Sequence, residues 1–125
     1  MTIQECYQNL GGDYRDVENR LMRESLVKKF IAMFPEDGSF DQLCRAMEEG
    51  NRQDAFRAAH TLKGICGNLS LTKLYASSSR LTELLRPEAD TIPQEANALL
   101  ETVRKDYELA VGIIRAFLNQ DSHGA

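Results

Sequence analysis

The chain has 125 residues, of which 42% are hydrophobic and 27% charged, and its formal net charge is −4. These values are typical of one globular domain that buries its own core without disulfides. The acidic balance, with no basic run longer than Lys28-Lys29, argues against a broad nucleic-acid interface. No segment approaches the roughly 18 apolar residues of a membrane span, and the first ten residues lack the features of a signal peptide. We therefore expect a cytoplasmic protein.

Two short helices are predicted at the start of the chain. Thr2 and Glu5 form the pattern of a capping box for the first of them, and Gly11-Gly12 ends it. Asp13 is placed to cap the second, whose apolar positions recur at helical spacing. Both segments are too short to form the long core of a bundle.

The next two predicted helices are separated by helix-breaking residues. Apolar residues three and four positions apart predict a helix over 23–34, which Pro35 and Gly38 end. Ser39 is then a candidate cap for a helix that runs to Gly50.

Three longer helices follow. Asn51 is placed to cap a helix over 51–69, and the corner at 69–71 leads to a helix over 71–86, with Thr72 as its candidate cap. Pro93 suits the first turn of a final helix over 93–119. The apolar and small positions that define the inner stripe of the 71–86 helix are Leu74, Tyr75, Ser78, Leu81 and Leu85.

The pattern as a whole predicts an all-α protein, an up-and-down four-helix bundle with additional short N-terminal helices. We expect the segments 23–34, 51–69, 71–86 and 93–119 to form the bundle, and the two N-terminal segments and 39–49 to cap it. Residues 1–120 are predicted to be a single domain. Residues 121–125, which include His123, are predicted to be a flexible tail.

The predicted helix over 52–69 has two distinct faces when its residues are placed about 100° apart. His60 lies at the centre of the polar face, opposite the apolar one. The apolar face consists of Ala55, Ala58, Ala59, Leu62, Ile65, Cys66 and Leu69. The polar face around His60 consists of Gln53, Phe56, Arg57, Lys63, Gly64 and Gly67. A histidine on the exposed side of a buried helix, beside two cations and two glycines, indicates a chemical role.

The residue types on this face suit phosphoryl transfer. A neutral imidazole is a competent nucleophile, and it can carry a group as a covalent adduct. Lys63, three residues after His60, lies within side-chain reach on the same surface and can neutralise phosphoryl oxygens. Arg57, three residues before His60, is a candidate second cation or docking residue.

Three other residues on this face have two interpretations each. Gly64 and Gly67 each cost about 1 kcal/mol relative to alanine inside a helix. They either leave room for the backbone of a partner protein, or Gly64 ends the helix. Phe56 is either an exposed docking contact or packs at the edge of the bundle against another helix.

The stretch His60-Thr61-Leu62-Lys63-Gly64, with a further apolar residue at Leu69, resembles the motif of histidine-containing phosphotransfer (HPt) domains. The chain also has the length of one such domain, so the resemblance extends over essentially all of it. The resemblance implies a helical bundle in which His60 relays a phosphoryl group between aspartates of receiver domains in a two-component phosphorelay. It also implies that Lys63 stabilises the phosphoryl group and that Gly64 gives receivers clearance.

The same resemblance implies which partners and cofactors act with the chain. Response-regulator receiver domains and a sensor histidine kinase are the expected partners, and the receiver supplies the Mg²⁺ of the transfer site. The chain itself is expected to bind no cofactor or metal, to have no kinase activity and to be a monomer. Its three cysteines, widely spaced and odd in number, are expected to be reduced thiols.

The sequence departs from the family pattern at two positions. Ser70 stands ten residues after His60, where the family often has glycine. Many members carry a glutamine on the following helix that holds the imidazole or the phosphoryl group, and the nearest position by counting is Thr82. The group that orients the His60 ring is therefore left open.

Two other classes of function are compatible with the same residues. The first is an interaction module that binds signalling partners without being phosphorylated. The second is an enzyme in which His60 is a general base or a metal ligand, although no carboxylate or nucleophile shares its face.

Overall fold

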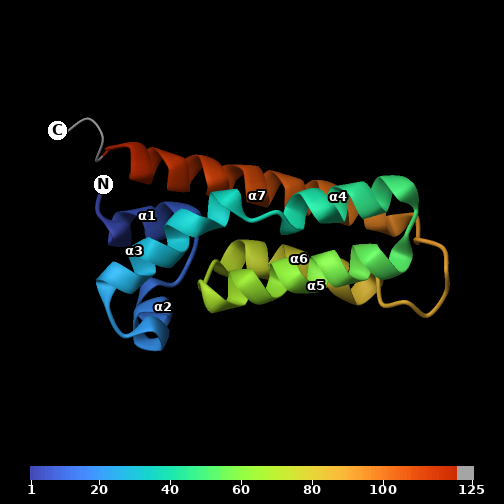
Figure 1. Cartoon of the computed structure of the whole chain (residues 1–125), viewed down its shortest axis with the longest axis horizontal. Coiled ribbons are helices and arrows are strands. Elements are labelled where there is room, and N and C mark those ends of the chain that lie inside the picture. The colour runs from blue at the N-terminus through green and yellow to red at the C-terminus, as the bar shows by residue number, and fades with distance from the viewer. Residues whose placement is uncertain (121–125) are drawn as a thin grey trace.

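The structure, a computed structural model, describes residues 1–120. The predicted tail at 121–125 and His123 lie outside the described residues. The described part of the chain folds into seven α-helices and one turn of 3₁₀ helix (Figure 1). In chain order these are α1 (Ile3–Leu10), α2 (Tyr14–Leu21), α3 (Glu24–Met33), η1 (Phe34–Glu36), α4 (Ser39–Glu49), α5 (Arg52–Asn68), α6 (Thr72–Leu84) and α7 (Glu95–Gln120).

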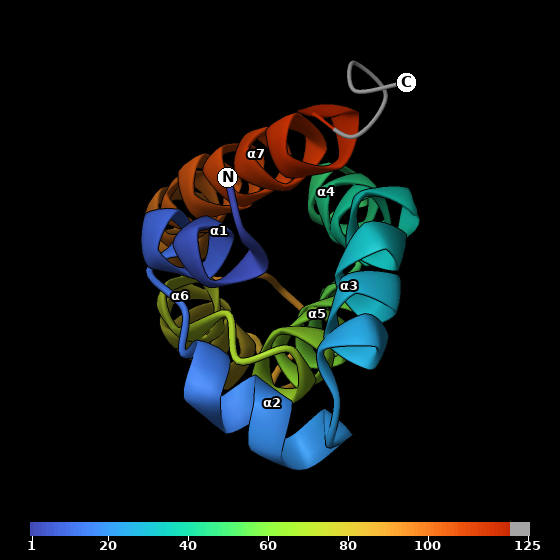
Figure 2. The ribbon, with the colours of Figure 1, turned by 90° about the vertical axis from the view of Figure 1, so that its left-hand side faces the viewer.

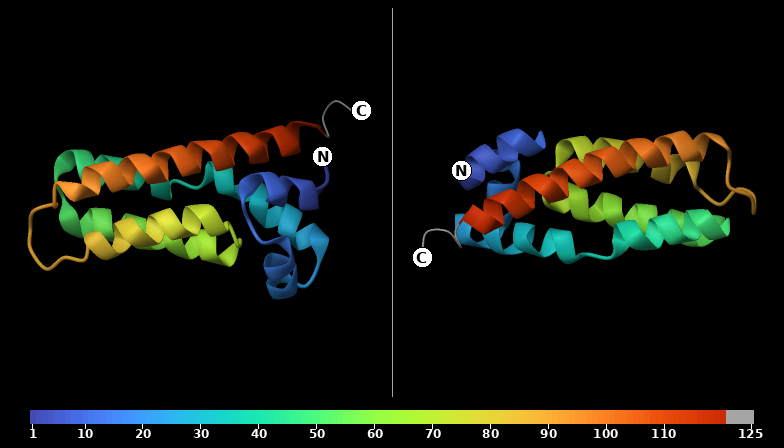
Figure 3. Two further views of the ribbon diagram at one scale, coloured as in Figure 1. Left: turned by 180° about the vertical axis from the view of Figure 1, so that it is seen from behind. Right: turned by 90° about the horizontal axis from the view of Figure 1, so that it is seen from above.

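The four helices α4 to α7 form an up-and-down bundle, which is the architecture that the sequence predicts. Short connections join α4 to α5 and α5 to α6, so these neighbours run antiparallel, and α6 packs along α7 (Figures 1 and 3). Seen along its length in Figure 2, the molecule is a ring of helices, with α7 above and α5 and α6 below. Their inward faces contribute most of the buried apolar side chains.

Aromatic side chains join α4 to α7 and close the ring. The rings of Phe40 and Tyr107 are stacked with centroids 4.3 Å apart, and Phe34 lies 5.7 Å from Tyr107 in a tilted arrangement. Such pairs are worth about 0.5–1.5 kcal/mol beyond the area they bury. The contact fixes the side of the bundle opposite α6.

The predicted division between bundle and cap was wrong for two segments. Residues 39–49 belong to the bundle, whereas 23–34 lies with α1 and α2 at the end of the molecule where α7 ends, and α1 and α3 contact α7 there (Figures 1 and 3). Helices α3 and α4 follow one another along α7, and the break between them is η1, which contains Pro35. Helical periodicity identifies the buried face of a helix but not the neighbour that covers it, so the two segments could not be told apart.

Three of the predicted helix caps are confirmed and two are wrong. Thr2 and Glu5 form a capping box, Asp13 accepts a hydrogen bond from the amide of Asp16, and Asn51 accepts one from Asp54. Ser39 and Thr72, in contrast, are the first residues inside their helices.

The cysteines have no disulfide partner, and two of the three are fully buried. Burial raises the pKa of Cys6 to about 11 and that of Cys66 to about 12, so both thiols are protonated at neutral pH. Within the described part of the chain, none of the helices has both the length and the apolar character needed to cross a bilayer.

Candidate functional site

The helix that carries His60 is continuous through both of its glycines. It begins after the Asn51 cap and ends at Asn68, so Gly64 lies inside the helix. The interpretation of Gly64 as a helix end is therefore wrong. A continuous helix keeps Lys63 and Gly64 one turn from His60 on the same surface.

The predicted division of this helix into two faces is confirmed. His60 is exposed, whereas Ile65 is the one member of the predicted apolar face that is only partly buried. The buried members of that face are Ala55, Ala58, Ala59, Leu62, Cys66 and Leu69. The small alanines let α5 lie close to its neighbours while the imidazole stays accessible to a large partner.

Phe56 packs against the imidazole ring. The two ring centroids lie 6.0 Å apart with an angle of 25° between the planes. The guanidinium of Arg86 also lies over the Phe56 ring, 5.6 Å from its centroid. This guanidinium is paired with both carboxylate oxygens of Glu83. Phe56 is thus half-buried at the edge of the bundle, between the imidazole of His60 and the guanidinium of Arg86.

Lys63 lies beside His60 in an open hollow of about 350 Å³. Its ammonium is 6.0 Å from the centroid of the Tyr75 ring, which comes from α6. Gly64 and Gly67 line the same hollow. Among residues 1–120 no carboxylate lines it, although the whole chain is acidic, so its charge favours an anion.

The two glycines of this face serve different purposes. A Cβ built on Gly64 meets no other atom within 4 Å, so the space above this residue is open to a partner. A Cβ on Gly67 would lie 3.1 Å from the Tyr75 ring, so this glycine lets α6 approach α5 closely. Tyr75 was predicted to face inward, but it is 40% exposed and covers Gly67.

Arg57 does not reach the hollow. Its side chain is exposed, it forms an ion pair of 3.6 Å with Asp54, and it lines a separate groove between α4 and α5. The hollow therefore contains His60, Lys63, Gly64 and Gly67 of the predicted site, without Arg57.

A family model described as Hpt domain matches residues 25–111. The chain belongs to the Hpt domain family. Comparisons with curated proteins and with solved structures gave no match. The matched range begins in α3 and ends in α7, so α1 and α2 lie outside it and the resemblance covers less of the chain than expected. Hpt domains act as histidine phosphocarriers in phosphorelays, with kinases and receiver domains as partners.

This Hpt domain forms the corner between α5 and α6 with a serine in an unusual conformation. Ser70 has a φ of 54°, in the left-handed region that glycine adopts most readily. Its hydroxyl donates a hydrogen bond of 2.7 Å to Asp16 and accepts one of 3.0 Å from Arg20. These bonds from α2 hold the corner in place.

Thr82 does not orient the histidine of this Hpt domain. It is fully buried, and its hydroxyl donates a hydrogen bond of 2.7 Å to the carbonyl of Ser78 one turn earlier. The side chain in contact with the ring is Phe56 on the same helix as His60.

Sequence reasoning missed one cation of the site. Arg20 of α2 lines the hollow together with His60 and Lys63. Asn68, at the end of α5, and Tyr75 complete its wall. No local pattern relates Arg20 to His60, because the two residues meet only through the packing of α2 against the corner of α5 and α6.

Proposed function

We propose that this Hpt domain carries a phosphoryl group on His60 and exchanges it with aspartates of receiver domains. The observation that supports this most strongly is the exposed imidazole at the centre of α5, in a hollow that also contains Lys63 and that no carboxylate of residues 1–120 lines. In-line transfer requires access from outside the protein, and the open space above Gly64 supplies it.

The proposed transfer needs no proton donor from this chain. The lone pair of a neutral ring nitrogen of His60 attacks the phosphorus of an aspartyl phosphate, and a nitrogen–phosphorus bond forms. The bond between phosphorus and the aspartate oxygen breaks, and the carboxylate leaves with its electron pair. In the reverse direction a receiver carboxylate attacks phosphorus, and the imidazole is the leaving group.

Lys63 acts on the charge of the phosphoryl group in this scheme. Its ammonium stands within side-chain reach of the ring, so it stabilises the oxygens that carry negative charge through the transfer. The receiver is proposed to contribute the Mg²⁺ for the transfer in its own acidic site, and the upstream partner is proposed to be a sensor histidine kinase. This chain acts as a phosphocarrier.

The test is transfer of label from phosphorylated receivers of the same organism to this protein. We expect the wild type to gain a label that is labile in acid and stable in alkali, and His60→Gln to gain none. His123→Gln, which removes the other histidine of the chain, is the matched control and should be labelled like the wild type. A wild type that binds a receiver but never gains label would show an interaction module and contradict the proposal.

A further inference from the structure

Arg20 belongs to the same hollow as His60 although it comes from a different part of the chain. It lies on α2, outside the range that matches the family, and lines the hollow with Lys63. The hollow therefore presents two cations, one from α5 and one from α2. Within the described part of the chain, no carboxylate side chain lines it.

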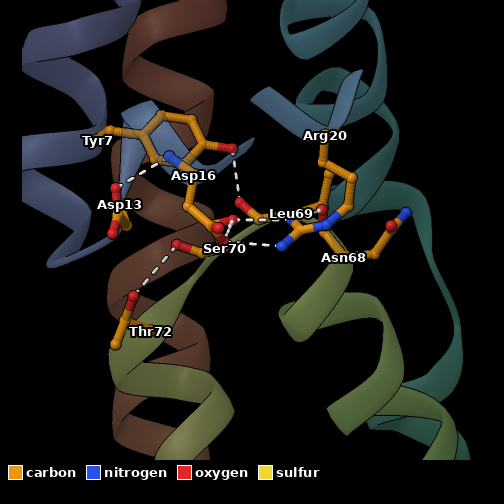
Figure 4. A network of polar contacts seen from close by, with 8 residues as sticks. All are labelled: Tyr7, Asp13, Asp16, Arg20, Asn68, Leu69, Ser70 and Thr72. Carbon is orange, nitrogen blue, oxygen red and sulfur yellow. Dashed lines mark hydrogen bonds and ion pairs between the residues drawn. The ribbon is translucent and has the colours of Figure 1, made fainter. Parts of the chain in front are cut away.

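Backbone and side-chain oxygens hold the Arg20 guanidinium in place (Figure 4). One of its terminal nitrogens, Nη1, donates to the carbonyl of Asn68 at 2.9 Å and to the hydroxyl of Ser70 at 3.0 Å. The other, Nη2, donates to Asp16 at 2.8 Å. Hydrogen bonds from Ser70 and Arg20 lower the pKa of Asp16, so its carboxylate is ionised at neutral pH.

The network leaves part of the donor capacity of Arg20 unused. A guanidinium has five N–H groups, and three of them have acceptors here. The Nε–H and one Nη2–H have none among residues 1–120. The side chain is 38% exposed and lines the hollow that an anion would enter. A guanidinium binds phosphoryl oxygens with two N–H groups at once.

We propose that Arg20 is a second cation of the phosphoryl site and that its free N–H groups bind the phosphoryl oxygens once His60 is modified. This inference rests on the proposed function of His60. Asp16 and the phosphoryl group would then share the guanidinium of Arg20, and α2 would contribute directly to the stability of the phosphorylated state. If Arg20 instead only holds α2 against the corner, Asp16 and Arg20 act together, and loss of either has the same consequence.

The pKa of the phosphoryl group on His60 distinguishes these two roles. The protein is loaded with phosphoramidate in a His123→Gln background, so that His60 is the single histidine, and the phosphorus NMR signal is titrated with pH. A nearby cation favours the doubly charged phosphoryl group and lowers its pKa. Arg20→Gln should raise the titration midpoint by about half a pH unit, as expected for an ion pair partly in water. Arg20→Lys keeps the positive charge and should bring the midpoint most of the way back to the wild-type value.

Two further variants serve as controls. Arg57→Gln removes a cation outside the hollow and should move the midpoint less than Arg20→Gln does. Asp16→Asn removes the competing carboxylate, leaves the guanidinium in place and should lower the midpoint. An unchanged midpoint in Arg20→Gln, or a rise in Asp16→Asn, would overturn the role of Arg20.

The failure of this inference is separable from the failure of the proposed function. Phosphoramidate modifies the ring without a receiver, so the titration reports on Arg20 alone. If no receiver phosphorylates the wild type, the proposed function is contradicted whatever the titration shows. If phosphoramidate itself fails to modify His60, the accessible imidazole on which both proposals depend is contradicted.

Discussion

Replacing Gly64 by glutamine should abolish phosphoryl transfer from receivers while the protein stays folded. The position is inside α5 and a Cβ there meets no atom within 4 Å, so the side chain extends into the space that a partner must occupy. A displacement of about 1 Å from the reactive geometry can cost about a hundredfold in rate, and we expect at least that loss. The rate of label transfer from a phosphorylated receiver measures it.

Gly112 offers a matched control for this substitution. It is also an exposed glycine inside a long helix, α7, with no atom within 4 Å of a built Cβ, but it lies away from the hollow. Glutamine is the better helix former by up to about 1 kcal/mol, so neither Gly64→Gln nor Gly112→Gln should lower the melting temperature. Transfer at the wild-type rate in Gly64→Gln, or equal losses in both variants, would contradict the proposed role of Gly64 in access.

Arg52→Leu should destabilise the protein strongly, because Arg52 is a buried cation that joins the start of α5 to the end of α6. The Arg52 side chain is 9% exposed, and its guanidinium donates to the carbonyls of Thr91 and Arg86, each at 2.7 Å. It also donates to the carbonyls of Leu84 at 3.2 Å and Leu85 at 3.4 Å. One side chain at the start of α5 therefore satisfies the end of α6 and the connection to α7.

The expected loss in the free energy of unfolding is about 3 kcal/mol, because hydrogen bonds to a charged group are worth about 1.5–3 kcal/mol and several are lost together. Urea unfolding followed by circular dichroism measures it. Arg57→Leu, one and a half turns further along α5, removes only an exposed ion pair and should change stability by less than about 0.5 kcal/mol. Equal effects of the two substitutions would show that Arg52 does not hold this end of the bundle.

Local patterns in the sequence were sufficient to predict the orientation of His60. The helical spacing of apolar residues over 52–69 predicts which face of the helix is buried. The structure confirms that the imidazole is exposed and that Leu62 is buried. The continuation of α5 through Gly64 followed from the same pattern, because Cys66 and Leu69 stay in phase with Leu62. These features depend only on residues within one helix.

Features that depend on packing between distant segments could not be predicted. Gly67, like Gly64, is a glycine on the polar face of α5, yet it accommodates the Tyr75 ring of α6. Arg20 and Ser70 are 50 residues apart in the chain, and only the fold brings them together and places Arg20 in the hollow with His60. Arg52 stands in the first turn of α5, and its acceptors all lie at the end of α6 or in the connection to α7. In each case the relevant neighbour comes from another helix, about which periodicity carries no information.

The most direct test of the central claim is to locate the phosphorus atom in the protein after phosphorylation by a receiver. Correlated phosphorus, nitrogen and proton NMR on isotope-labelled protein shows which side chain has formed a bond to phosphorus. We expect a nitrogen–phosphorus connection in the His60 ring, with the largest accompanying changes in the amide signals of α5 around Lys63 and Gly64. Phosphorus bonded to His123 or to any other side chain, with the His60 ring unmodified, would contradict the account.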